Sequence, residues 1–331
     1  MDEKAAIEEA VRCRLSLLRY LEDEDRGRML FLEQMGAFDS GEGLTIGFPP
    51  GMMQTAGALR KHYHAELLHA PTWVIEEDVV ETLADAWESY PSTTAYSTDV
   101  LTPSGFALLA RPVPDPEYGD ETMAHGIFWT VSDSATGAGS YLKVSDNAQV
   151  ITIMFLGRLH GLPWHQYDPP RLYPYTSIVW QLDAPGGGHL WEDQVSSRIA
   201  ETQRAPFVKF LLSLFSIIRD RLAEAQEPHE RVKRAADKLK HYRRKQPDLN
   251  STIQVVRFRP RTGSGNKLSE SSSGRKLTVR AWTRPFWRMQ WYPSTQENKP
   301  KLIRSFARGP EGAPEVGRER ILLAPKPLKN R

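Results

Sequence analysis

The chain has 331 residues, of which 40% are hydrophobic, 25% charged and 10% aromatic, and this composition argues against wholesale disorder. Its net charge of +2 conceals an asymmetry. Residues 1–228 contain 17 Lys and Arg against 33 Asp and Glu, whereas residues 229–331 contain 26 against 8. Such a separation indicates a polyanionic partner for the basic part. The alternative is that the two parts neutralise each other across an internal or dimer interface.

Three features of the sequence predict a cytoplasmic location. The most apolar helical stretch, residues 205–223, contains four charged residues and is too short for a bilayer span. The first residues contain no apolar segment of the kind found in a signal peptide. Cys13 is the only cysteine, which excludes an intrachain disulfide and a thiolate metal cluster. No cofactor, metal or membrane contact is therefore expected.

Residues 1–228 are predicted to form an acidic α+β domain. Apolar residues recur at helical spacing in four segments: 2–22, 55–69, 73–91 and 204–226. β-branched and aromatic runs between turn residues indicate strands at 105–111, 126–131, 150–156 and 176–182. Most of these strands are not separated by a helix-length segment, so an antiparallel sheet beside the helices is expected. The broad apolar face of residues 204–226 closes the core or, alternatively, forms the seam of a homodimer.

Residues 229–331 are predicted to form a smaller basic domain made of a helix and a β-hairpin. The helix, residues 229–245, is basic around its circumference and suits a phosphate backbone through Lys240, Arg243 and Arg244. Alternation predicts a strand at 252–259 and another at 276–283, on either side of a Ser/Gly-rich flexible loop at 262–274. These two strands are expected to pair as a long hairpin.

The most unusual stretch of the chain is residues 280–293, in which three of the nine tryptophans alternate with arginines. Flat rings and guanidinium groups at this density are typical of surfaces that stack bases and contact phosphates. We expect phosphate contacts from Arg280, Arg284 and Arg288, and stacking or packing by Trp282, Trp287, Trp291 and Tyr292. The alternative is that the rings fill a small core.

Two loops carry the residues most typical of an enzyme. The candidates are His160, His165 and Asp168 on one loop and His189 and Glu192 on the next. A histidine beside a carboxylate suits a general base, and the first three residues would also suit a partial metal shell. No serine or cysteine stands in a nucleophile-elbow context, and surface loops have the same composition. Elsewhere, His62 and His64 lie two residues apart on different helix faces and are expected at the surface.

The end of the chain resembles a known family. Residues 287–293 read W-R-M-Q-W-Y-P, and residues 308–314 read R-G-P-E-G-A-P. This ending is similar to that of a family of uncharacterised proteins from actinobacteria and their phages and plasmids, in which a lysine stands at the position of Arg308. Residues 103–109 resemble a strand entry in the same family. The resemblance implies an actinobacterial or mobile-element setting, and it implies no reaction.

Together these patterns favour a non-catalytic nucleic-acid-binding protein, with DNA and RNA equally compatible. The second hypothesis is an enzyme that acts on nucleic acid or nucleotides through the two histidine-bearing loops. The third is an assembly protein whose basic part binds an acidic protein surface, including that of a neighbouring copy.

Overall fold

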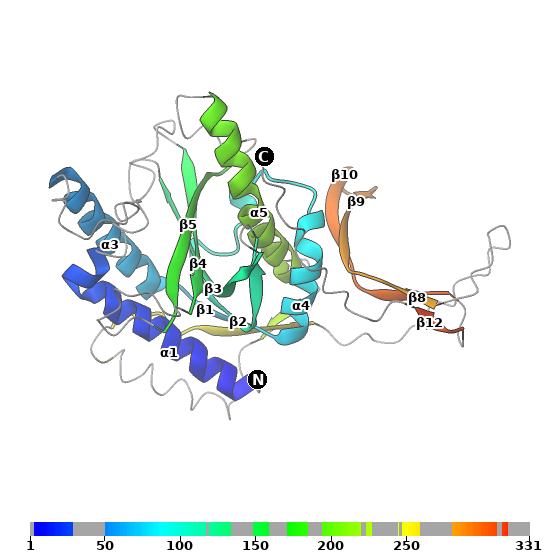
Figure 1. The fold of residues 1–331 in the computed structure, drawn as a ribbon, viewed down its shortest axis with the longest axis horizontal. Helices are drawn as coiled ribbons and strands as arrows, with labels where there is room; N and C mark the ends of the chain where they lie inside the picture. Colours follow the sequence, from blue (N-terminus) through cyan, green and yellow to red (C-terminus); the bar gives the residue numbers. More distant parts are fainter. Residues whose placement is uncertain are drawn as a thin grey trace.

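The computed structural model describes residues 3–28, 50–116, 119–133, 148–158, 171–184, 194–219, 223–226, 244, 247–258, 280–309 and 313–316. These residues form an α+β fold, as the sequence predicts, with a mixed sheet between two layers of helices. A separate group of short strands projects beyond one helical layer (Figure 1).

The central sheet has seven strands in the order β5-β4-β3-β2-β1-β7-β6. The strands are β1 (Thr72–Ile75), β2 (Ser104–Asp115), β3 (Gly119–Asp133), β4 (Gln149–Gly157), β5 (Tyr173–Gln181), β6 (Ala223–Gln226) and β7 (Ile253–Phe258). Strands β2 to β5 form an antiparallel meander, which confirms the antiparallel arrangement predicted for them. In contrast, β1 is parallel to both β2 and β7, so the sheet as a whole is mixed.

Helices cover both faces of this sheet (Figure 1). Helices α1 (Glu3–Glu22) and α3 (Pro50–His69) pack on the face that contains Val74 and Phe106. Helices α4 (Glu77–Ala86) and α5 (Gln194–Arg219), with the 3-10 helices η1 (Trp87–Ser89) and η2 (Ser97–Asp99), lie on the other side. Because both faces are covered, β1 is buried at all four positions. None of the described helices is long and apolar enough to span a membrane.

Two predicted helices include residues that form strands. Within the segment 73–91, residues up to Ile75 belong to β1, and the helix begins only at Glu77. Within the segment 204–226, α5 ends at Arg219, begins ten residues earlier than predicted, and is followed by strand β6. In β1 the aromatic and β-branched residues pair on both sides with other strands, and this pairing outweighs the helical spacing of the apolar residues.

The predicted basic hairpin is wrong. Strand β7 does not pair with Arg280–Thr283, the described part of the second predicted strand, but lies in the central sheet between β1 and β6. The proposed boundary at residue 228 therefore falls between two neighbouring strands of one sheet, β6 before it and β7 after it. The predicted helix 229–245, apart from Arg244, and the loop 262–274 lie outside the described residues.

The remaining strands form a projection that we call the arm, residues 280–309. It contains β8 (Arg280–Thr283), β9 (Phe286–Tyr292), β10 (Glu297–Ile303) and β11 (Phe306–Arg308). Strands β9 and β10 form a two-stranded antiparallel ribbon. Strand β8 pairs with β11 on one side and with β12 (Glu315–Val316) on the other. Figure 1 shows the arm beyond α4, on the side of the molecule away from α1 and α3.

A buried arginine joins the helices of the opposite layer to the sheet. The Arg14 side chain is fully buried and donates to the backbone oxygens of Leu67, Leu68 and Asn250 and to the Thr72 hydroxyl. Burial lowers its pKa to about 9, so the guanidinium is still charged at neutral pH. It thereby satisfies carbonyls at the carboxyl end of α3, where a cation is favourable.

Candidate nucleic-acid interface

The structure describes only some of the nucleic-acid-binding and catalytic candidates that the sequence predicts. Lys240 and Arg243 lie outside the described residues, as do His160, His165, Asp168, His189 and Glu192. Arg244 is described and its side chain is exposed. The other seven nucleic-acid candidates all lie in the arm.

Trp287 is part of the core and cannot stack on a base. Its side chain is only 4% exposed, and its indole Nε1 donates to the Ser213 hydroxyl at 2.7 Å. Its backbone N–H donates to the Ser89 hydroxyl at 2.9 Å, and its ring meets that of Tyr90 edge-on, with centroids 5.1 Å apart. Of the two roles predicted for Trp287, stacking or packing, the structure therefore shows packing. The ring instead attaches the root of the arm to α5 and η1.

The register of β9 and β10 separates the arm ribbon into two chemically different faces. Directly opposed residues in an antiparallel pair share a face, and successive pairs alternate between faces. The pairs on one face are Trp287 with Leu302, Met289 with Pro300, and Trp291 with Asn298. The pairs on the other face include Arg288 with Lys301 and Gln290 with Lys299. One face is thus mainly apolar. The other carries the three basic residues of the ribbon, between the pair Phe286–Ile303 at one end and the pair Tyr292–Glu297 at the other.

The apolar face emerges from the core towards the tip of the ribbon. Trp287 and Leu302 are buried at the root, whereas Met289 is 49% exposed and Trp291 is 53% exposed. Trp282 and Phe306, in the β8–β11 pair, are exposed as well. Of the five large apolar side chains that are exposed among the described residues, four therefore lie in the arm. Such a concentration indicates a contact surface.

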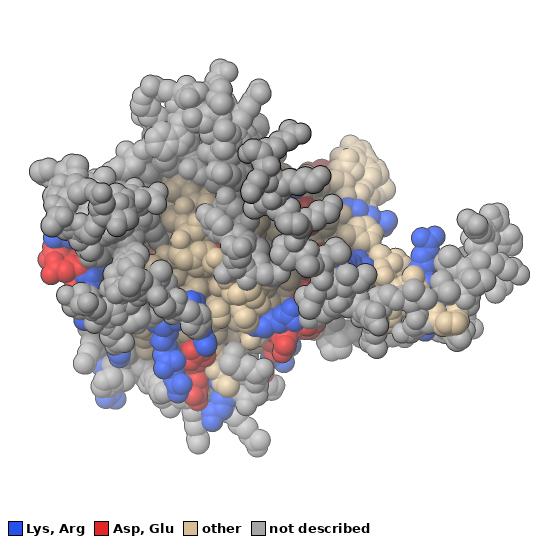
Figure 2. Space-filling model, viewed as in Figure 1, with Lys and Arg blue, Asp and Glu red and all other residues tan. Residues whose placement is uncertain are grey.

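The basic face places like charges directly opposite each other. Arg288 faces Lys301 across the ribbon, an arrangement that is destabilising unless an anion is present. Among the residues that the structure describes, Arg288 and Lys301 form no ion pair, and Arg288 donates only to the Gln290 side-chain oxygen at 3.3 Å. Lys299 pairs with Glu297 at 2.9 Å, but both side chains are more than half exposed, so this pair is weak. Figure 2 shows blue side chains on the arm among uncharged residues.

The other predicted arm residues differ in their accessibility. Arg284 is exposed, whereas Arg280 and Tyr292 are half-buried. Arg280 is tied to the small sheet because its backbone N–H donates to the Pro314 oxygen at 2.9 Å. Arg304 is also engaged, since its guanidinium carbon lies 4.0 Å from the centroid of the Phe258 ring in β7. The exposed contact set is accordingly Arg284, Arg288 and the ring of Trp291, and Lys301, opposite Arg288, is half-buried.

Sequence reasoning missed the pairing of Arg288 with Lys301. The alternation within residues 286–292 is the signal that separates Trp287, Met289 and Trp291 from Arg288 and Gln290. The pairing of Arg288 with Lys301 follows from a turn at residues 293–296, in which Gln296 adopts a positive φ of 52°. Only the register shows that the two cations share a face.

Comparison with known proteins provides no independent assignment. No protein-family model matches the chain, and no curated protein sequence matches it. The resemblance of residues 287–314 to the actinobacterial family remains a prediction.

Proposed function

We propose that the protein binds nucleic acid without catalysis, through the β9–β10 ribbon of the arm. The observation that carries this proposal is the two-faced ribbon: opposed cations without described ion pairs on one side and an exposed tryptophan on the other. The proposal includes a cytoplasmic location and an actinobacterial, phage or plasmid setting, which follows the resemblance at residues 287–314. The enzyme hypothesis rests on loops outside the described residues and gains no support from the arm.

A two-stranded antiparallel ribbon is an element that nucleic-acid recognition uses. A two-stranded β-ribbon fits the major groove of duplex DNA, and an exposed indole can also stack on an unpaired base. In this arrangement Arg288 and Lys301 neutralise phosphates, and Arg284 adds a third cation near the root. Trp291, near the tip and on the opposite face, contacts a base or the wall of a groove. The buried Trp287 attaches the root of the ribbon to α5 and η1 through Ser213 and Ser89.

The test is binding of the purified protein to labelled single-stranded and duplex DNA and RNA over a salt series. We expect affinity to fall steeply with salt, because phosphate contacts release counterions. Replacing Arg288 and Lys301 together with glutamine should reduce the logarithmic salt slope by about 1.4–1.8, since each phosphate contact contributes about 0.7–0.9. Replacing Trp291 with alanine should cost about 1–3 kcal/mol of binding if its ring stacks.

A matched control removes two exposed lysines elsewhere, Lys4 on α1 and Lys61 on α3, by the same substitution. This control lowers the net charge equally and should change the salt slope much less. Equal effects of the two double variants would show that net charge, and not the ribbon, causes binding. Absence of binding to all four ligands at low salt would overturn the proposal and redirect the search to an acidic protein partner.

A further inference from the structure

The cations and the exposed apolar side chains of the β9–β10 ribbon point in opposite directions. Arg288 and Lys301 form an opposed pair on one face of the ribbon. Met289 and Trp291 lie on the other face and are 49% and 53% exposed. A single nucleic-acid strand lying flat on the ribbon therefore contacts the cations or the apolar side chains, but not both sets. A ligand that contacts both faces must have two walls.

The groove of a double helix has two such walls, each formed by the sugar–phosphate backbone of one strand. A sheet layer with its side chains is about 10 Å thick, which is the distance at which sheets stack. The major groove of B-form DNA is about 12 Å wide and admits a two-stranded ribbon, whereas the undistorted minor groove is only about 6 Å wide. The major groove of A-form RNA is deep and too narrow for side chains to read. The dimensions of the ribbon therefore select the major groove of B-form DNA.

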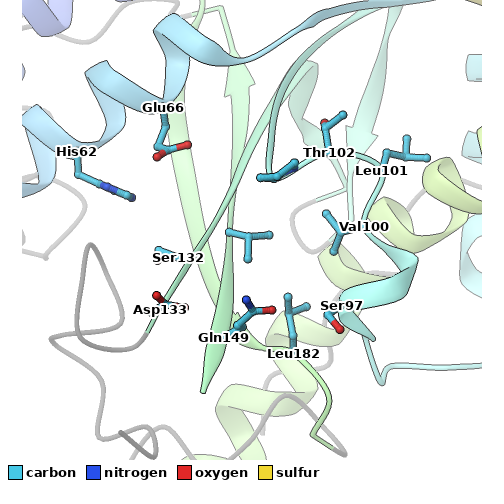
Figure 3. Close-up of a pocket in the computed structure, with 12 residues that line it drawn as sticks. His62, Glu66, Ser97, Val100, Leu101, Thr102, Ser132, Asp133, Gln149 and Leu182 are labelled. Carbon is cyan, nitrogen blue, oxygen red and sulfur yellow. The ribbon is translucent and has the colours of Figure 1, made fainter. Parts of the chain in front are cut away.

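A pocket of about 590 Å³ beside α3 is unsuited to a polyanion. Figure 3 shows His62 and Glu66 projecting from α3 toward the end of β3, where Asp133 lies. The described lining of this pocket contains two carboxylates and no lysine or arginine, so it repels phosphate. On α1, the Arg12 guanidinium is paired with the Glu8 carboxylate at 3.3 Å. These features favour the arm as the surface that contacts the duplex.

We infer that the arm binds B-form duplex DNA, with the β9–β10 ribbon in the major groove. This inference rests on the proposed function and names its ligand. Arg288 and Lys301 contact the phosphates of one wall of the groove. Met289 and Trp291 lie against the other wall, where they pack on sugars and on thymine methyl groups. The thymine methyl group lies in the major groove, so it reports which groove the ribbon occupies.

The first experiment compares three ligands of one sequence: duplex DNA, single-stranded DNA and duplex RNA. Each is labelled with a fluorophore and titrated with the full chain at one salt concentration, and binding is followed by fluorescence anisotropy. We expect duplex DNA to bind at least about tenfold more tightly than either of the others. Duplex RNA has the same number of phosphates per base pair, so charge alone does not produce this preference.

The outcomes of this comparison distinguish the inference from the proposed function. If single-stranded DNA or duplex RNA binds as tightly as duplex DNA, the inference is overturned while nucleic-acid binding stands. If none of the three ligands binds, the proposed function fails and the inference fails with it.

The second experiment replaces thymidine with deoxyuridine throughout the DNA duplex. This substitution removes methyl groups from the major groove and leaves the minor-groove edges of the bases unchanged. We expect the deoxyuridine duplex to bind several-fold more weakly, because the apolar face loses its methyl contacts. Equal binding of the two duplexes would overturn the inference.

Variants locate this methyl contact. The difference between the two duplexes should disappear in the double variant Met289→Ala/Trp291→Ala and persist in Tyr96→Ala. Tyr96 is a matched control because its side chain is 50% exposed and lies outside the arm. Unchanged circular dichroism verifies that each variant is folded. A difference that persists undiminished in the double variant would place the methyl contact elsewhere and contradict the assignment.

Discussion

Substitution of Trp287 tests whether this ring packs in the core. Because the structure buries the ring, its removal should lower the stability of the fold. Trp287→Ala removes an indole that is 4% exposed, together with its edge-on contact with Tyr90 and its hydrogen bond to Ser213. Truncation of a buried tryptophan to alanine costs about 3–5 kcal/mol of unfolding free energy. The exposed Trp291 serves as the control, and its replacement should change stability by only about 0.5 kcal/mol.

The hydrogen bond can be separated from the burial of the ring. Trp287→Phe keeps an aromatic ring but leaves the Ser213 hydroxyl, which is fully buried, without its donor. An orphaned buried polar group costs about 1–3 kcal/mol. Adding Ser213→Ala removes the orphan and should recover part of that loss, because neither partner then remains unsatisfied.

The assay is urea unfolding followed by far-ultraviolet circular dichroism, with the free energy extrapolated to water for each variant. Equal m-values across the series are required for a direct comparison of stabilities. If Trp287→Ala costs no more than Trp291→Ala, the arm is not attached to the core through this ring. If Trp287→Phe is neutral, the bond to Ser213 contributes nothing and that part of the reasoning is refuted.

Three further variants or reagents test the core. Arg14→Met should lose about 3 kcal/mol or more in urea unfolding, because it leaves several buried carbonyls without the guanidinium; a loss below 1 kcal/mol would contradict this. The Cys13 thiol, whose pKa burial and Glu9 raise to about 12, should react with a thiol reagent near pH 8 only after unfolding, and rapid labelling of folded protein would refute its burial. Gly105→Ala should cost about 1–3 kcal/mol by the same assay, because its Cβ would lie 2.1 Å from the buried Trp129 ring; unchanged stability would mean that the ring moves freely.

Local periodicity determined most of the element types and the fold class. The apolar residues of 2–22 repeat at helical spacing, and that segment forms α1 almost to the predicted residue. The four runs between residues 105 and 182 form β2 to β5, since period-two alternation and turn residues are properties of the local chain. Antiparallel pairing of these strands follows because short connections leave few alternatives.

Strand pairing between distant segments determined the two elements that the sequence predicted wrongly, β1 and the partner of β7. Strand β1 is only four residues long, and its identity depends on β2 and on β7, which lies some 180 residues later in the chain. The same parallel pairing draws β7 into the central sheet and removes it from the predicted hairpin. Contacts between distant segments carry no local periodicity, so no window of sequence contains them.

In the candidate sites, too, the local sequence determined which residue types are present, and the tertiary structure determined which of them are accessible. Composition and spacing determined that aromatic and basic residues concentrate after residue 280, and the structure places their accessible members in one arm. Only the tertiary structure decided that Trp287 is buried while Trp291 is exposed, and that His62 and His64, which the sequence places at the surface, are half-buried on α3. The physical reason is that burial belongs to the neighbours a residue meets in space: Ser213 and Tyr90 cover Trp287, whereas no described segment covers Trp291 to the same extent.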